Sequence, residues 1–303
     1  MATVSSLRQD QVTDPDDPLV AELADRQWRW RIRHRYADDA AGRAAAAALV
    51  RELFDRSRLV RTPVGFVWLG PDGEHTPVHD VRAEGDDPRH VAALRDLTTE
   101  LAGSPLAAGV PPGEPSREAF VDDGTFRLTA TSMRLDVTGP VPGEELASRA
   151  QVTPMTDAEV LAYRDGAVES YAQSRTEAGE SPGLARTTSE AAFDELLPGG
   201  RPGPDQHLFT IRHAGERAGM VWVCRRWPAQ AWVYDVEVDP AWRGHGLGAA
   251  AMVHAARWTR AAGLPSLGLN VFGPNAHARS LYERLGYAVE EEHFARDPST
   301  DAR

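Results

Sequence analysis

The segment at residues 239–249 carries the clearest chemical pattern in this chain. It reads DPAWRGHGLGA, and Gly244, Gly246 and Gly248 alternate immediately before an expected helix. Glycines allow successive backbone N–H groups to turn towards one point with no side chain in the way. A helix N-terminus adds the positive end of its dipole, and Arg243 adds a full charge. The segment is therefore suited to bind an anion such as a pyrophosphate.

Two other interpretations of the glycine pattern stay open. A glycine-rich turn between a strand and a helix can exist without any ligand, and a glycine pattern alone is weak evidence. A dinucleotide-binding turn would follow the first strand of a βαβ unit and would need an acidic residue ~20 positions later. At least three predicted strands precede the glycines here, which disfavours the dinucleotide interpretation.

Two carboxylates lie in the strand pattern that precedes the glycines. In AWVYDVEV, strict alternation would place Asp235 and Glu237 on the same face as Val233. Two carboxylates on a central strand are costly unless that face lines a cleft or a hydrogen-bond network. Glu237 is therefore our candidate general base, acting directly or through water. Binding of the acceptor is the alternative role for it.

Strand and helix patterns alternate through the C-terminal half and position these residues. Strands are predicted at residues 152–155, 207–212, 219–224, 231–238 and 267–271. Helices are predicted at residues 157–175, 190–197, 246–262 and 278–285, and the last should end at Gly286. This order of elements predicts a mixed sheet in an α/β fold.

The composition restricts the class of protein. The 303 residues include 33 basic and 45 acidic side chains, which give a formal charge of −12, and 42% of the residues are hydrophobic. Every Lys/Arg position is arginine, so no lysine general base or Schiff base is available. The single cysteine, Cys224, allows no internal disulfide and indicates a reducing compartment. No apolar run approaches the ~18 residues that a membrane span needs.

We therefore expect a cytoplasmic protein with no membrane partner, no nucleic-acid partner and no metal. The five histidines of the C-terminal half outside the glycine segment show no metal-ligand spacing with carboxylates. Residues 28–36 alternate basic and aromatic side chains, which could contact nucleic acid. The acidic residues around them favour an amphipathic element instead.

The glycine segment and the elements after it resemble the GNAT superfamily of acyl-CoA-dependent N-acyltransferases. Residues 243–248, RGHGLG, match the Arg/Gln-x-x-Gly-x-Gly/Ala signature of that family. LGLNV at 267–271, NA at 275–276 and LYERLGY at 281–287 are similar to the family's next strand and helix. The resemblance covers residues 150–296 and implies a mixed-sheet acyltransferase domain there.

The resemblance also implies a role for each matching position. The backbone of Val236 and Val238 would pair with the pantetheine arm of coenzyme A, and Asn275 would donate a hydrogen bond to that arm. Asn270 would be a cleft residue, with structural hydrogen bonding as its alternative. Arg243 would lie near the coenzyme A pyrophosphate, which the amides of the following residues would hold: Gly244, His245, Gly246, Leu247, Gly248 and Ala249.

The implied chemistry is direct attack of a neutral amine on the thioester, with the oxyanion stabilised by a backbone N–H. Tyr282 would protonate the departing thiolate, although its position on an apolar helix face also suits a core tyrosine. Some relatives place a glutamate on the strand that holds Asn270 here. That base is missing from this chain, which is why Glu237 is the candidate.

An internal repeat extends the interpretation to the N-terminal half. Gly65 starts GFVWL as Gly219 starts GMVWV, and HDV at 79–81 parallels YDV at 234–236. Residues 90–101 correspond to 252–262, and residues 117–124 loosely parallel 279–286. The segment RAEGDDP at 82–88 lacks the alternating glycines and is acidic where a phosphate would bind. We therefore expect two tandem GNAT-like lobes, of which the first is degenerate.

The repeat suggests a structural role for Asp235, because the first repeat has the same residue type, Asp80, at the matching position. Glu237 corresponds to Arg82 instead, which favours a functional role for Glu237. The expected organisation is a disordered tail at 1–17, a degenerate lobe at 18–140, a linker at 141–150 and a catalytic domain at 151–297. The expected activity is acetyl transfer from acetyl-CoA to a primary amine of a small molecule. Alternatives are an amino-sugar acetyltransferase similar to mycothiol synthase, a protein N-acetyltransferase and a non-catalytic acyl-CoA-binding module. The oligomeric state stays open.

Overall fold

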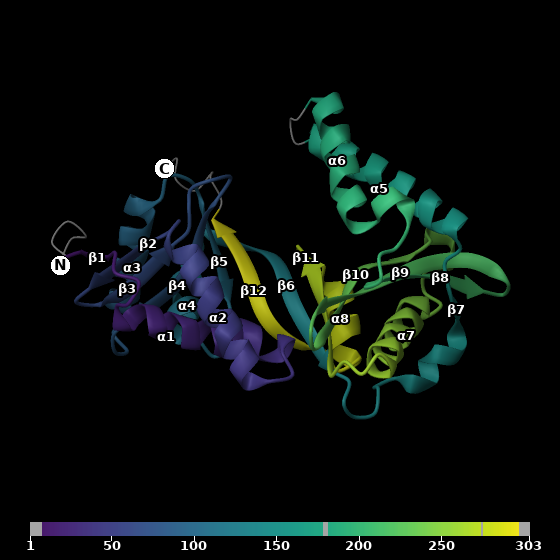
Figure 1. Cartoon of the computed structure of the whole chain (residues 1–303), viewed down its shortest axis with the longest axis horizontal. Helices are drawn as coiled ribbons and strands as arrows, with labels where there is room; N and C mark the ends of the chain where they lie inside the picture. Colours follow the sequence, from purple (N-terminus) through teal and green to yellow (C-terminus); the bar gives the residue numbers. More distant parts are fainter. Residues whose placement is uncertain (1–7, 178–180, 274, 297–303) are drawn as a thin grey trace. The chain divides into compact units, whose positions relative to one another are not determined.

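A computed structural model describes residues 8–177, 181–273 and 275–296 (Figure 1). It confirms the predicted mixed α/β fold, because all described strands belong to one sheet with parallel and antiparallel neighbours. Helices and strands follow the same order twice along the chain. The first set is β1 (Asp10–Val12), α1 (Pro18–Gln27), α2 (Asp39–Phe54), β2 (Arg58–Thr62), β3 (Gly65–Leu69), β4 (Thr76–Ala83), α3 (Pro88–Leu101), β5 (Leu106–Val110), α4 (Pro115–Val121) and β6 (Phe126–Asp136).

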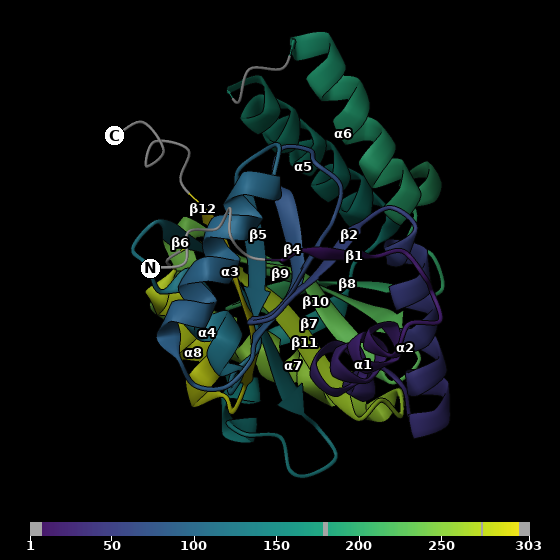
Figure 2. The ribbon, with the colours of Figure 1, turned by 90° about the vertical axis from the view of Figure 1, so that its left-hand side faces the viewer.

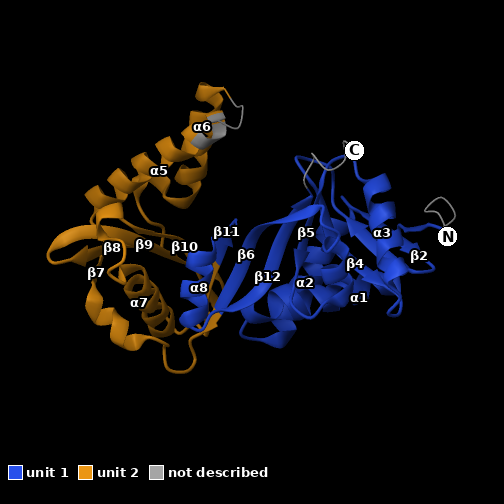
Figure 3. Ribbon diagram, turned by 180° about the vertical axis from the view of Figure 1, so that it is seen from behind, with its two compact units in different colours: residues 1–134, 270–303 blue, residues 135–269 orange. Residues whose placement is uncertain are grey.

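The second set is β7 (Gln151–Pro154), α5 (Asp157–Glu177), α6 (Pro182–Leu196), β8 (Gln206–His213), β9 (Glu216–Trp227), β10 (Gln230–Val238), α7 (Leu247–Ala261), β11 (Ser266–Phe272), α8 (Ala276–Arg284) and β12 (Ala288–Arg296). We call residues 10–136 the first repeat and residues 151–296 the second repeat. By contacts, the chain divides differently, into unit 1 (residues 1–134 and 270–303) and unit 2 (residues 135–269), as Figure 3 shows. The strand order is β1-β2-β3-β4-β5-β12-β6 in unit 1, up to Arg134 of β6, and β10-β9-β8-β7 in unit 2. Strand β11 begins in unit 2, next to β10, and belongs to unit 1 from Asn270 onwards.

Unit 1 has a hydrophobic core on each face of its strands, since successive strand residues alternate between the faces. On one face, Leu59, Phe66 and Trp68 pack with residues of α1 and α2. On the other face, Val67 and Leu69 pack with residues of α3 and α4. Figure 2 shows these two helix pairs on opposite sides of the strands.

Unit 2 has the same layering. Met220 and Trp222 of β9 pack against Val160, Val168 and Phe193 of α5 and α6. Helix α7 covers the other face of β8–β10 (Figure 1). Alanine-rich α7 is buried along most of its length, which lets it lie close to the strands.

The strand pairings confirm the internal repeat in detail. Strand β4 has a bulge at His79, because Trp68 pairs with Asp80 and Leu69 pairs with Val78. Strand β10 has the matching bulge at Tyr234, between the pairs that involve Val233 and Asp235. A β-bulge re-aims the side chains around it and is a feature that related strands keep.

Two glycines also match between the repeats. Gly65 begins GFVWL, Gly219 begins the similar GMVWV, and the two glycines have positive φ angles of 138° and 154°. A Cβ at Gly65 would lie 2.0 Å from the carbonyl oxygen of Arg82, and a Cβ at Gly219 would lie 2.1 Å from that of Glu237. The close approach of the neighbouring strand therefore requires glycine at both positions.

Three local expectations need correction. Residues 10–12, assigned to the disordered tail, form β1 and pair with β2, and Val12 is buried there; residues 1–7 lie outside the described residues. The helix expected at 190–197 begins earlier, at Pro182, because Ser181-Pro182 provides a helix start. The expected linker contains a short helix at Glu144–Arg149. The domain boundaries themselves stay a proposal.

Candidate active site

The glycine segment forms a helix start whose first amides no side chain caps. A 3-10 turn at Pro240–Trp242 follows β10, and Gly244 and Gly246 then adopt positive φ angles of 83° and 76°. Gly246 is the N-cap residue of α7, and it supplies no side-chain hydrogen bond. Within the described residues, the N-terminal amides of α7 are therefore left for water or for a ligand.

The equivalent helix of the first repeat begins in the opposite way. The carboxylate of Asp87 accepts a hydrogen bond of 2.9 Å from the amide of Arg89, and Pro88 at the first helical position has no N–H. Hydrogen bonds from the side chain and the amide of Arg89 lower the pKa of Asp87 to about 2. A carboxylate of the chain itself thus occupies the N-terminus of α3.

Cationic side chains surround the segment before α7. The Nε atom of Arg243 donates a hydrogen bond of 3.2 Å to the carbonyl of Val238, and Arg243 is exposed to solvent. Arg149 packs against Gly246 so closely that a Cβ there would lie 2.6 Å from its Nη1 atom. Arg149 was not among the predicted site residues, because nothing in its spacing links it to the glycine segment. His245 points its ring at neighbouring backbone carbonyls, in line with a role for its amide.

The C-terminal part of β10, next to the glycine segment, is not paired with β11. Strand β10 pairs with β11 from Gln230 to Val233, and the pairing with β9 alone continues through Asp235 to Val238. The backbone of Val236 and Val238 therefore has an edge outside the β11 pairing. An extended ligand can add to such an edge as a strand would.

The bulge corrects our prediction of which side chains share a face. Val233 pairs with Val223 and Asp235 pairs with Trp222, and these neighbours on β9 face opposite ways. Asp235 and Glu237 thus lie on the face of α5 and α6, whereas Val233 lies on the face of α7. The sequence argument failed because an extra residue, Tyr234, interrupts the alternation.

Aromatic and acidic groups gather on that face of β10. The hydroxyl of Tyr163, in α5, donates a hydrogen bond of 2.8 Å to Asp235. Burial, together with the charge of Asp235, raises the pKa of Tyr163, so this hydroxyl stays a proton donor. The ring of Tyr234 lies 4.6 Å from that of Trp222, and Tyr234 is 43% exposed. Glu237 is exposed on the same face.

The remaining predicted residues, Asn270, Asn275 and Tyr282, belong to unit 1. The amide oxygen of Asn270 accepts a hydrogen bond of 2.6 Å from the hydroxyl of Ser132. The amide oxygen of Asn275 caps α8 by accepting 3.0 Å from the N–H of Ala278, so its NH₂ group is what could reach a ligand.

Tyr282 is buried on α8, with its ring 5.7 Å from that of Tyr287. The amide of Tyr287 bonds to the carbonyl of Tyr282 at 3.0 Å, and Gly286 has a φ of 83°. This is a helix-ending motif that brings two such side chains together. The packing fixes the ring of Tyr282, whatever its hydroxyl does.

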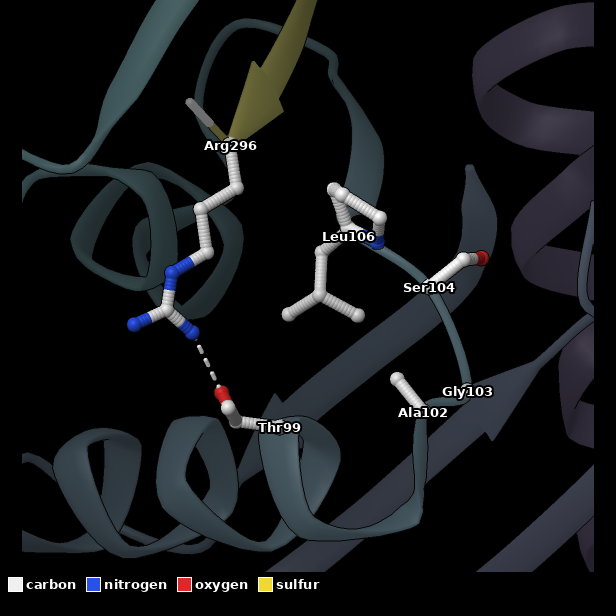
Figure 4. Close-up of a pocket in the computed structure, with 7 residues that line it drawn as sticks. Thr99, Ala102, Gly103, Ser104, Leu106 and Arg296 are labelled. Atoms are coloured by element: carbon white, nitrogen blue, oxygen red, sulfur yellow. Dashed lines mark hydrogen bonds between the residues drawn. The ribbon is translucent and has the colours of Figure 1, made fainter. Parts of the chain in front are cut away.

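Three described cavities of unit 1 are lined by none of the predicted coenzyme A or catalytic residues. One of about 270 Å³ lies at the end of α3, where Arg296 donates a hydrogen bond of 2.6 Å to Thr99 (Figure 4). Across the part of the chain that the structure describes, no group of three or more His, Cys, Asp and Glu residues is placed to hold a metal ion. None of the helices described there is long and apolar enough to cross a membrane.

Comparison with known proteins supports the family assignment. The model of the Acetyltransferase (GNAT) family matches residues 169–287. An uncharacterized N-acetyltransferase of Bacillus subtilis, YycN, is 31% identical over 141 residues, which are 45% of this chain and 90% of that protein. A mycothiol acetyltransferase of Nocardiopsis dassonvillei is 45% identical over 69 residues, 23% of this chain and 21% of that protein.

A solved structure resembles the whole chain in fold. It is the GCN5-related glucosamine N-acetyltransferase region of a fungal multi-domain β-N-acetylglucosaminidase, with a TM-score of 0.52. The match covers 96% of this chain and 38% of that chain at 15% sequence identity. At such identity the likeness concerns the fold alone.

Proposed function

The chain belongs to the GNAT acetyltransferase family, and from this premise we propose that it transfers an acetyl group from acetyl-CoA to a primary amine of a small molecule. The observation that carries the proposal is the glycine-rich start of α7. Its amides lack a side-chain cap and are flanked by Arg243 and Arg149. Together they suit the pyrophosphate of coenzyme A.

Coenzyme A would bind along β10 and the start of α7. The amides of residues 244–249 would hold the pyrophosphate, and the edge of Val236 and Val238 would pair with the pantetheine arm. Asn275 would contact the arm through its NH₂ group. Asn270 would act in the cleft or would only position its neighbours, since Ser132 already bonds to it.

The transfer needs a base and an acid. The nitrogen of the neutral amine forms a bond to the acetyl carbon while the bond from that carbon to sulfur breaks. Glu237, directly or through water, would accept the proton that the nitrogen loses, and Tyr282 would donate a proton to the leaving thiolate. An exposed carboxylate suits proton exchange with solvent after each turnover.

We propose further that the first repeat does not bind coenzyme A. Asp87 caps α3 where the pyrophosphate would bind, and an anion there would be repelled. Calorimetric titration with acetyl-CoA tests both proposals together with the stoichiometry. We expect one site per chain. Two sites would refute the proposal that the first repeat does not bind coenzyme A, and no binding would refute the proposed acetyltransferase activity.

Tyr282→Phe tests the catalytic assignment. It should lower kcat while the affinity for acetyl-CoA stays unchanged, because the hydroxyl acts only on the leaving thiolate. Tyr287→Phe is the matched control, since it removes one hydroxyl from the contacting ring. If Tyr282→Phe keeps the wild-type kcat, Tyr282 has no part in the reaction.

An acceptor like that of a mycothiol acetyltransferase is a second candidate, favoured by the 45% identity over 69 residues. The match spans 21% of that protein, so the acceptor is open to direct test. An amino-sugar acceptor belongs in the same acetylation assay, and a rate far above that of simple amines would favour this candidate.

A further inference from the structure

In the first repeat, the bulged strand β4 binds a cationic group of the chain itself. Asp80, directly after the bulge of β4, accepts hydrogen bonds of 2.7 and 3.0 Å from Nε and Nη2 of Arg26 in α1. The guanidinium of Arg26 also lies 4.0 Å from the ring centre of Trp30. A carboxylate and an aromatic face here hold a cation that the chain supplies itself.

The second repeat keeps the carboxylate but replaces the cation. Asp235 occupies the position of Asp80 after the matching bulge, and its partner from the preceding helix is the neutral hydroxyl of Tyr163. Among the residues that the structure describes, no ion pair links Asp235 or Glu237 to an arginine or a histidine. Tyr234 directly precedes Asp235, and its half-exposed ring packs against Trp222, which pairs with Asp235.

We propose that the acceptor carries a second cationic group, an ammonium or a guanidinium, besides the amine that is acetylated, and that Asp235 and the ring of Tyr234 bind this group. The inference rests on the proposed acetyl transfer and names its substrate class. Glu237 serves the reacting amine, while Asp235 and Tyr234 hold the second cation. Tyr163 keeps the carboxylate of Asp235 in place through its hydrogen bond.

Three acceptors of equal length test the charge requirement: 1,4-diaminobutane, 4-amino-1-butanol and 4-aminobutanoate. Their far ends are cationic, neutral and anionic, while the reacting amine is the same. We expect kcat/KM to be at least about tenfold higher for the diamine than for the amino alcohol, since charge-assisted bonds exceed neutral ones. The amino acid should be the poorest. Equal values for the diamine and the amino alcohol would overturn the proposal.

Two variants test whether Asp235 and Tyr234 cause the preference for the diamine. Asp235→Asn and Tyr234→Leu should each reduce the preference for the diamine through KM, with KM for acetyl-CoA unchanged. Glu169→Gln is the matched control, because it removes one exposed carboxylate elsewhere in unit 2. A preference that survives both variants, or that Glu169→Gln removes equally, would contradict the assignment of the site.

Direct binding separates this inference from the proposed function. Titration of 1,4-diaminobutane into wild type and into Asp235→Asn requires no turnover. Binding to the wild type that the variant loses supports the cation site even if acetyl-CoA fails to bind. Binding of acetyl-CoA without any binding or acetylation of the diamine would leave the acetyltransferase standing and overturn the cation site.

Discussion

Alanine at Gly219 should destabilise the protein and disturb the coenzyme site together. The new Cβ would lie 2.1 Å from the carbonyl oxygen of Glu237 and 3.0 Å from the Cα of Val238. Atoms in contact need more than ~3 Å, so the paired strand must move by about 1 Å. A strained backbone angle costs ~1–3 kcal/mol and forced overpacking a similar amount, which gives about 4 kcal/mol in all.

This loss is large enough to measure by thermal unfolding. For a unit of this size, each kcal/mol lowers Tm by roughly 2–4 °C, so Tm should fall by about 8–16 °C. The displaced stretch includes Val238, whose other edge is proposed to pair with the pantetheine arm. The affinity for acetyl-CoA, measured by calorimetry below the unfolding transition, should therefore fall as well.

Gly65→Ala provides the matched control inside the same chain. Its Cβ would lie 2.0 Å from the carbonyl oxygen of Arg82, so the loss of stability should be similar. If only the second repeat binds acetyl-CoA, this variant keeps the wild-type affinity. An unchanged Tm in Gly219→Ala would refute the steric argument. Equal losses of affinity in both variants would refute the assignment of the site to the second repeat.

Two further predictions follow from single side chains. Arg149→Ala should weaken acetyl-CoA binding by about tenfold, which is the value of one charge-assisted hydrogen bond. Tm should stay constant, because Arg149 is exposed. As a control, substitution of another exposed arginine of the same unit, Arg201→Ala, should leave the affinity measured by calorimetry unchanged. Burial, with the charges of two nearby arginines, lowers the pKa of His79 from 6.5 to about 4, so the unfolded chain takes up a proton first and stability is lost as pH falls from 6.5 towards 4. The loss at pH 5 relative to pH 7 should be about 2 kcal/mol in urea unfolding, and His79→Phe should remove it; the same pH dependence in both proteins would contradict this.

Local patterns in the sequence predicted much of the fold and the start of α7. The alternation of Gly244, Gly246 and Gly248 is a property of adjacent residues, and the repeated strings around Gly65 and Gly219 need only comparison along the chain. Both concern short stretches whose conformation neighbouring residues determine. The family resemblance then matched the strand predicted at 267–271 and the helix after it to elements of a known family.

The details that failed depend on partners distant in the sequence. The bulge at Tyr234 is visible only in the pairing with β9, so alternation put Asp235 on the wrong face. Arg149 reaches Gly246 because of the path that the chain takes before β7, which no local pattern encodes. The start of α6 is different, because Ser181-Pro182 is a helix-start signal that is present in the local sequence.

The ion pair of Arg26 and Asp80 has a consequence for how the two repeats respond to their surroundings. A group tethered to the same chain has an effective concentration set by the fold, which dilution of the protein does not change. The carboxylate of the first repeat is thus saturated at every level of free amine, and the pair is almost fully buried. Among the described residues, no arginine or histidine of the chain pairs with Asp235 in this way. At the cation site proposed there, occupancy would therefore follow the concentration of amine in solution. The first repeat thus holds its own cation at all times, whereas the proposed site of the second repeat would fill only when a cationic amine is present.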